Sequence, residues 1–173
     1  TNMTAFTWEL RNYVDQINAT GSPPLAPDNE LRDVILRSSS APTRLLDDIY
    51  NYTFRYVPYE DAMYICAPEQ ATLLNLLARM MRARESLDVG TFTGYSAAAV
   101  AHALPASGRL TGIELKSEYA DIAARFLGTL TPTIDMRVGD ALEQLAALER
   151  EGRQFDFISI DADKQQQKDY YEA

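Results

Sequence analysis

The sequence is poor in the residues that form disulfides and zinc sites, with one cysteine and one histidine in 173 residues. Cys66 has no second cysteine to pair with, and Cys66 with His102 falls short of the four ligands of a structural zinc site. We therefore expect Cys66 to be buried or half-buried. No apolar run reaches the roughly 18–20 residues of a transmembrane helix, and no charged-then-apolar leader opens the chain. These absences favour a protein of the reducing cytoplasm without membrane contact.

Clusters of positive charge are missing as well. Lysine and arginine number 16 against 25 aspartates and glutamates, which gives a net charge of −9. Nucleic-acid backbones and anionic membranes attract basic patches, so neither is expected as a partner. The composition is that of an ordinary globular domain. A small molecule is the favoured partner.

The stretch of residues 87–96, Leu-Asp-Val-Gly-Thr-Phe-Thr-Gly-Tyr-Ser, predicts a strand, a tight turn and the start of a helix. Glycine lets the backbone approach a ligand, and the first N–H groups of the helix favour an electron-rich group. A dinucleotide fingerprint would need glycine at Phe92 and Tyr95, and a Walker A loop would need lysine before Ser96. We interpret the stretch as a cofactor turn that disfavours NAD and FAD and lacks the lysine needed for a nucleoside triphosphate.

Acids follow two further predicted strands. Residues 109–114 end in Glu114, which can accept hydrogen bonds from both hydroxyls of a ribose. The alternative is an exposed acid that caps the helix predicted over 117–127. Residues 134–138 lead to Asp140, which either receives an adenine amino group or caps the helix predicted over 142–149.

The strongest chemical cluster is Asp161, Asp163 and Lys164, directly after the apolar strand predicted over 155–160. Parallel sheets collect their functional groups at the carboxyl ends of strands. The pattern therefore indicates a functional site rather than a solvated charge cluster.

Residues 88–96 and 161–164 resemble two motifs of one family. Asp-Val-Gly-x-x-x-Gly-Tyr-Ser is similar to motif I of the S-adenosylmethionine-dependent methyltransferases. Phe92, where most of these enzymes have glycine, is typical of the small metal-dependent O-methyltransferases of the catechol and caffeoyl-CoA type and their bacterial relatives. Asp-Ala-Asp-Lys resembles their metal-site motif. The resemblance implies an α/β fold, a Rossmann-like class I methyltransferase sheet with helices on both faces.

We expect two parts in this chain. Residues 1–62 are predicted to form an N-terminal helical cap or arm, with helices around 10–17, 30–37 and 43–52, and residues 63–173 the S-adenosylmethionine-binding domain. The family sheet has seven strands, whereas this sequence supplies four, near 86–90, 109–114, 134–138 and 155–160. We therefore expect a chain truncated at its C-terminus, a fragment that need not be active alone.

The resemblance also assigns roles. Asp161 would bind Mg²⁺ or another divalent cation, and Lys164 would be the general base. A hard cation prefers oxygen ligands and acidifies a bound hydroxyl, and it also lowers the pKa of a neighbouring lysine. The residues that would contact the cofactor S-adenosylmethionine are Tyr64, Asp88, Gly90, Ser96, Glu114, Ala141 and Asp163.

The predicted function is Mg²⁺-assisted methyl transfer to a hydroxyl of a catechol-like aromatic substrate by a homodimer, which the resemblance implies. The substrate could be a free phenol, a coenzyme A ester or a natural-product intermediate. A metal-independent small-molecule methyltransferase and a non-catalytic cofactor-binding or interaction module remain as alternatives. The aromatic residues between 50 and 59 either pack the cap on the core or form a wall for a substrate ring.

Overall fold

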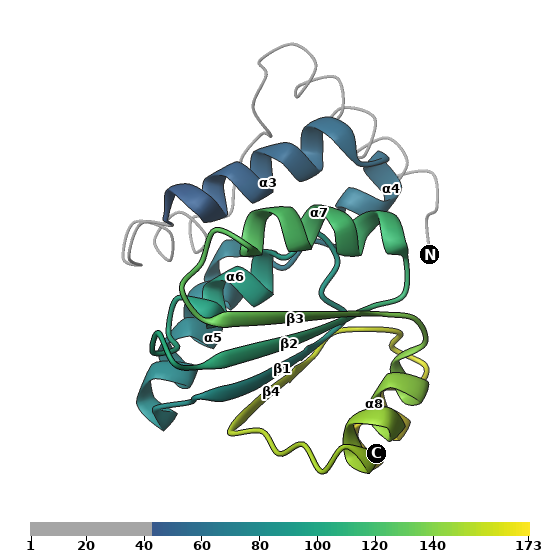
Figure 1. Ribbon diagram of the computed structural model, residues 1–173. Coiled ribbons are helices and arrows are strands. Elements are labelled where there is room, and N and C mark those ends of the chain that lie inside the picture. The colour runs from purple at the N-terminus through teal and green to yellow at the C-terminus, as the bar shows by residue number, and fades with distance from the viewer. Residues whose placement is uncertain (1–42) are drawn as a thin grey trace.

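The computed structural model describes residues 43–173, in which helices cover both faces of a parallel four-stranded sheet of order β3-β2-β1-β4 (Figure 1). The strands are β1 (Glu85–Val89), β2 (Arg109–Glu114), β3 (Thr133–Val138) and β4 (Phe157–Ile160). The helices are α3 (Arg44–Tyr56), α4 (Tyr59–Ala62), α5 (Pro68–Met81), α6 (Tyr95–Ala101), α7 (Ser117–Leu127), α8 (Ala141–Arg150) and α9 (Gln167–Glu172). The helices expected around 10–17 and 30–37 lie outside the described residues.

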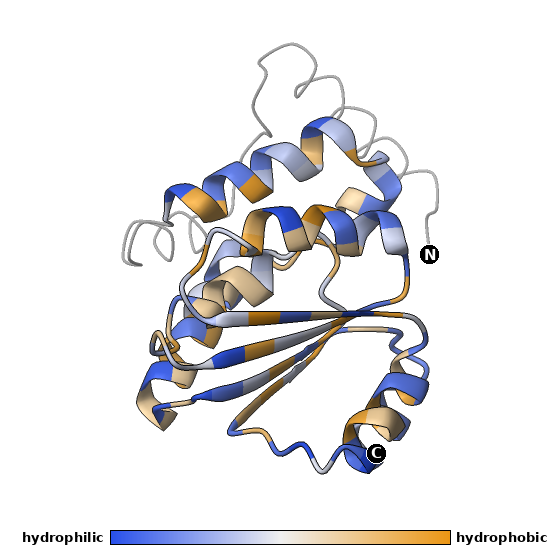
Figure 2. Cartoon of the chain, viewed as in Figure 1, coloured by the Kyte–Doolittle hydropathy of each residue, from blue (hydrophilic) through white to orange (hydrophobic). Residues whose placement is uncertain are grey.

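Two hydrophobic clusters lie on opposite faces of the sheet. Residues of α3, α5, α6 and α7 pack together on one face, with Leu110 and Phe157 from the sheet. On the other face Leu87, Val89 and Ile113 pack against residues of α8 and α9. In Figure 2 the strands carry hydrophobic stretches, and α3 and α7 alternate hydrophobic with hydrophilic residues, as helices with one buried face do.

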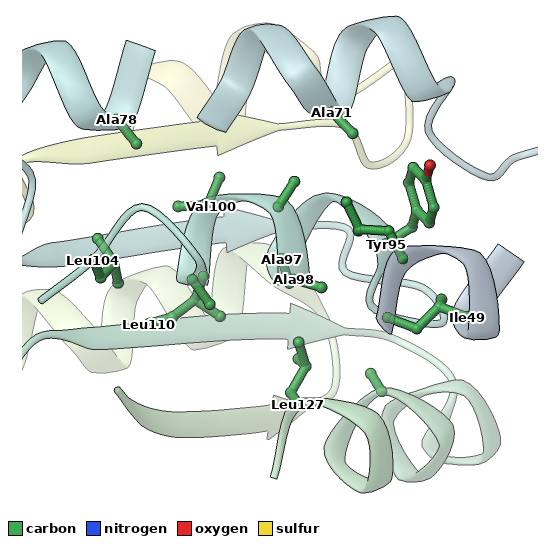
Figure 3. Close-up of a cluster of buried hydrophobic side chains, with 14 of the residues drawn as sticks. Ile49, Ala71, Ala78, Tyr95, Ala97, Ala98, Val100, Leu104, Leu110 and Leu127 are labelled. Atoms are coloured by element: carbon green, nitrogen blue, oxygen red, sulfur yellow. The ribbon is translucent and has the colours of Figure 1, made fainter. Parts of the chain in front are cut away.

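Helix α6 is buried along its whole length, because small side chains let it approach both α5 and the sheet. Ala97 and Ala98 are 0% exposed. Figure 3 shows Ala71 and Ala78 of α5 turned toward this helix, with Leu110 of β2 on its other side. The helix that follows the cofactor turn is therefore held by packing, and its first residue is fixed relative to the strands.

Helix α3 extends one turn beyond the expected end at residue 52. Thr43 caps its start, since its side chain accepts a hydrogen bond from the Leu46 N–H. Leu46, Ile49 and Thr53 are buried at helical spacing, and Thr53 Oγ1 lies 2.8 Å from Thr93 Oγ1. Packing on the core therefore continues the helix, and it joins the cap to the cofactor turn.

Strand β4 begins at Phe157, two residues later than expected. The Asp156 carboxylate accepts hydrogen bonds from the N–H groups of Arg84 and Glu85, while its own N–H donates to the Glu85 carbonyl at 2.7 Å, so Asp156 joins the strand to β1 just before the regular pairing begins. Among the described residues β4 pairs with β1 alone, and Ile158 is 52% exposed. No helix among residues 43–173 is long and apolar enough to cross a membrane.

Candidate cofactor and metal site

A cleft of about 510 Å³ opens at the carboxyl ends of the strands, within the size range of small-molecule sites. It brings together predicted residues from the ends of all four strands of the described sheet and from the segment before α5. Those of the predicted set that line it are Tyr64, Gly90, Glu114, Ala141, Asp161, Asp163 and Lys164. Asp88 and Ser96 lie behind the glycine turn, and Ser96 lines a smaller adjoining cavity with Tyr64, Gly90 and Asp161.

Packing within the protein already requires glycine at position 90 of the turn. Gly90 has φ +92°, and a Cβ added there would lie 2.7 Å from the carbonyl carbon of Asp161. From the sequence we expected Gly90 to let a ligand approach the backbone. The structure shows a different need for glycine here, because the backbone of Asp161 and Ala162 after β4 passes too close for a Cβ. The turn and the predicted metal ligand are thereby held in direct contact.

Asp88 is 2% exposed and accepts hydrogen bonds from the hydroxyls of Ser96, at 2.9 Å, and Ser159. Burial raises the pKa of Asp88 to about 6, against the lowering effect of these two hydroxyls. Asp88 thus joins β1, α6 and β4 beneath the turn. In this arrangement it supports the cleft rather than lining it.

We expect Asp88→Asn to change how stability depends on pH. Because the pKa of Asp88 is higher in the folded than in the unfolded chain, its contribution is fully present below pH 4 and is lost as the pH rises through 6. The two-unit difference corresponds to about 3 kcal/mol. Urea unfolding at pH 4 to 7 should show the wild type losing this amount relative to Asp88→Asn.

Asp156→Asn is the control of opposite sign. Backbone hydrogen bonds from Glu85 and Arg84 lower the pKa of Asp156, so its contribution is present at neutral pH and lost as the pH falls. Parallel stability profiles for wild type and Asp88→Asn would contradict the prediction.

Glu114 is 8% exposed, which rules out the alternative of an exposed helix cap. Its Oε2 accepts from the Phe92 N–H at 2.7 Å, and its Oε1 accepts from the Lys116 N–H at 3.0 Å. A carboxylate has about four acceptor positions, so two remain for hydroxyls in the cleft. The residues therefore fit a ribose, and the two N–H groups fix the carboxylate in place.

Asp161 and Lys164 form an ion pair at the end of β4, with side chains that are 50% and 68% exposed. Asp163 Oδ1 accepts a hydrogen bond from the Gln165 N–H. The described residues include no group of three or more His, Cys, Asp or Glu side chains arranged to hold a metal. Mg²⁺ is commonly held by one or two carboxylates with water and substrate oxygens, so Asp161 fits as one ligand.

The two interpretations of Asp140 are separated by its contacts. Its Oδ1 accepts from the N–H groups of Leu142 and Glu143, at 3.0 and 3.2 Å, so Asp140 is the N-cap of α8. Ala141 is the first residue of α8 and lines the cleft. Tyr64 is 76% exposed at the mouth, and Cys66 beside it is half-buried, with burial raising its pKa to about 12.

The cleft also contains residues that the sequence did not predict: Asp61, Phe92, Lys116 and Tyr119. Phe92 adopts φ +50°, and its ring meets the Tyr119 ring edge to face at 4.7 Å. Of the aromatic cap residues, Tyr50 packs on the core, since its ring contacts that of Tyr95. The alternative that these rings pack the cap is therefore confirmed for Tyr50.

The strand order, the glycine turn after β1 and the acid that ends β2 together define a Rossmann-like sheet of the class I methyltransferase type. The family model described as O-methyltransferase matches residues 37–173, and the chain belongs to that family.

The similar proteins carry related names. The chain is 41% identical over 119 residues to catechol O-methyltransferase domain-containing protein 1 of Mus musculus, a match that covers 66% of this chain and 45% of the relative. It is 38% identical over 109 residues to a catechol O-methyltransferase of Niastella koreensis, covering 61% and 49%. The chain thus spans about half the length of these curated relatives.

Among solved structures, the O-methyltransferase TomG of Streptomyces achromogenes, in complex with S-adenosylmethionine, superposes with a TM-score of 0.74 at 32% identity. The match covers 83% of this chain and 65% of TomG.

Proposed function

We propose that the protein transfers the methyl group of S-adenosylmethionine to a hydroxyl of a catechol-like aromatic substrate, with help from Mg²⁺ or another divalent cation. The observation that carries this proposal is the meeting, in one cleft, of the fixed Glu114 carboxylate with Asp161 and Lys164. The relatives named for catechol and the cofactor-bound TomG support the choice of substrate and cofactor.

The charges of the cleft suit a cationic cofactor. Its walls carry five carboxylates and two lysines: Asp61, Glu114, Asp140, Asp161 and Asp163, with Lys116 and Lys164. A cleft with surplus negative charge attracts a positively charged sulfonium group. When bound, the cofactor supplies the methyl group, and a divalent cation lowers the pKa of the substrate hydroxyl.

Each residue has a defined task in the proposed reaction. Glu114 accepts hydrogen bonds from the ribose and so orients the cofactor, while Asp161 supplies a carboxylate to the cation. With Asp161 binding the cation in place of the Lys164 ammonium, Lys164 in its neutral form would accept the proton of the substrate hydroxyl at Nζ. The deprotonated oxygen would then attack the methyl carbon in line as the carbon–sulfur bond breaks and S-adenosylhomocysteine leaves, a step that depends on positioning. The homodimer and the cytoplasmic location belong to the proposal and rest on the family resemblance and the single cysteine.

Lys164→Met tests the proposal in the 173-residue chain. We expect kcat with catechol, S-adenosylmethionine and Mg²⁺ to fall at least about 100-fold, because general-base catalysis contributes that much. The affinity for S-adenosylhomocysteine should stay within about threefold, since Lys164 does not hold the ribose. Methyl transfer measured by mass spectrometry and binding measured by calorimetry check the two parts.

Lys168→Met is the matched control, because Lys168 lies in α9 with its side chain 80% exposed. Equal activity of the two variants would exclude Lys164 as the base. Turnover that survives EDTA would identify a metal-independent methyltransferase. Binding without turnover by the wild type is the result expected of a cofactor-binding module, and also of a fragment that is not active alone.

A further inference from the structure

One wall of the cleft is held together by three side chains from two helices and the loop between β2 and α7. The Asp61 carboxylate of α4 accepts hydrogen bonds from the Lys116 ammonium, at 2.8 Å, and from the Tyr119 hydroxyl. The Lys116 Nζ also lies 4.9 Å from the centre of the Tyr119 ring. We refer to these three residues as the Asp61 cluster.

The Asp61 cluster is directly linked to the two groups that fix Glu114. Lys116 donates its backbone N–H to Glu114 Oε1, so the residue whose side chain binds Asp61 also holds the carboxylate. Tyr119 packs on the ring of Phe92, whose N–H binds Glu114 Oε2. Both backbone donors of Glu114 are therefore held from the side of α4.

The same wall is reinforced by apolar packing. Val57, Ala62 and Tyr119 form a buried cluster against which Phe54, Phe92 and Ile122 pack. Figure 1 shows α4 beside the start of α7, where this packing takes place. The hydrogen bonds from Lys116 and Tyr119 lower the pKa of Asp61, so it is ionised at neutral pH. A charged acceptor makes a strong hydrogen bond with a phenol.

We propose that Asp61 is a positioning residue for cofactor binding: through Lys116 and Tyr119 it holds the Phe92 and Lys116 backbone N–H groups that fix Glu114. It acts on the ribose subsite without touching the ribose. This inference rests on the proposed function and extends it to a helix that lies outside the sequence motifs. It also gives the cap segment a task in binding the cofactor.

The test is calorimetric titration of S-adenosylhomocysteine into the full 173-residue chain and its variants. We expect Asp61→Asn to weaken binding about tenfold, because one charged hydrogen bond and one partly exposed ion pair are lost. Lys116→Met should weaken it by a similar or smaller factor. If Asp61 acts through Lys116, the two substitutions should not be additive. The loss of affinity in the double variant should then be smaller than the product of the fold-losses in the two single variants.

Glu60→Gln is the matched control, since Glu60 is the exposed neighbour of Asp61 on α4, and it should bind like the wild type. Tyr119→Phe, which removes only the hydroxyl, provides a second variant if Asp61→Asn does not fold. An analogue of the ligand without its 2′-hydroxyl separates positioning from general weakening. Its penalty relative to S-adenosylhomocysteine should shrink in Asp61→Asn, whereas loose folding alone would leave that penalty unchanged.

Three results would overturn the inference. The first is Asp61→Asn, or Tyr119→Phe in its place, binding within twofold of a wild type that binds well. The second is an unchanged penalty for the missing 2′-hydroxyl. The third is a folded wild type that binds no S-adenosylhomocysteine. That result would overturn the proposed function together with this inference, whereas the first two would overturn this inference alone.

Discussion

Gly90→Ala is expected to destabilise the protein by about 3–5 kcal/mol and to lower its melting temperature by about 10 °C. Left-handed backbone with a Cβ costs about 1–2 kcal/mol, and overlap with the chain after β4 supplies the rest. The added methyl group would lie 2.7 Å from the Asp161 carbonyl carbon and 2.9 Å from the Ala162 nitrogen, and neither is the end of a flexible side chain. Urea unfolding with a thermal scan measures the effect.

Gly152→Ala separates the two causes. Gly152 also has a left-handed backbone, with φ +67°, but a Cβ there meets nothing within 4 Å. Its substitution should cost only about 1–2 kcal/mol. Equal losses in the two variants would show that contact with Asp161 does not explain the need for glycine at position 90.

Glu114→Gln should weaken binding of S-adenosylhomocysteine about 100-fold, which corresponds to the loss of hydrogen bonds to a charged acceptor. In glutamine the NH2 group replaces one of the two carboxylate oxygens. That NH2 group would face a backbone N–H of Phe92 or Lys116, so two donors would meet and one hydrogen bond would be lost. Calorimetry at neutral pH measures the change.

Glu118→Gln is the control for this second prediction, because Glu118 is an exposed acid in the first turn of α7. It removes the same charge a few residues away and should leave the affinity unchanged. An affinity of Glu114→Gln within about threefold of the wild type would exclude the carboxylate as the ribose acceptor.

Local pattern was sufficient to predict the central elements of the fold. The helix predicted over 117–127 is α7, and the strand predicted over 109–114 is β2, with the bounds expected. Both lie in segments where apolar spacing, glycine and acids agree on one structure. Glu114 could be assigned to the cleft from sequence because it is the last residue of a predicted strand. In a parallel sheet the carboxyl ends of all strands lie at one edge, and β2 pairs in parallel with both β1 and β3.

The parts that sequence missed depend on contacts between distant segments. Asp61 meets Tyr119 across a separation of 58 residues, and the spacing around Asp61 contains no signal for that contact. The clash that requires Gly90 arises from Asp161, which follows a different strand. The end of α3 likewise depends on packing and on the contact of Thr53 with Thr93. A prediction from local sequence alone therefore placed the end of the helix one turn too early. In each case a tertiary contact decided what the local pattern left open.

The position of β1 between β2 and β4 has a consequence for the order of folding. Ser86 pairs with Leu110, which lies nearby in the sequence, and on its other side with Phe157, which is synthesised much later. Contacts that close long loops form late, so the β3-β2-β1 portion can assemble while β4 is still emerging from the ribosome. During that interval the Gly90 turn has no neighbour at Asp161, and the nascent chain exposes the unpaired edge of β1, on which a chaperone can act.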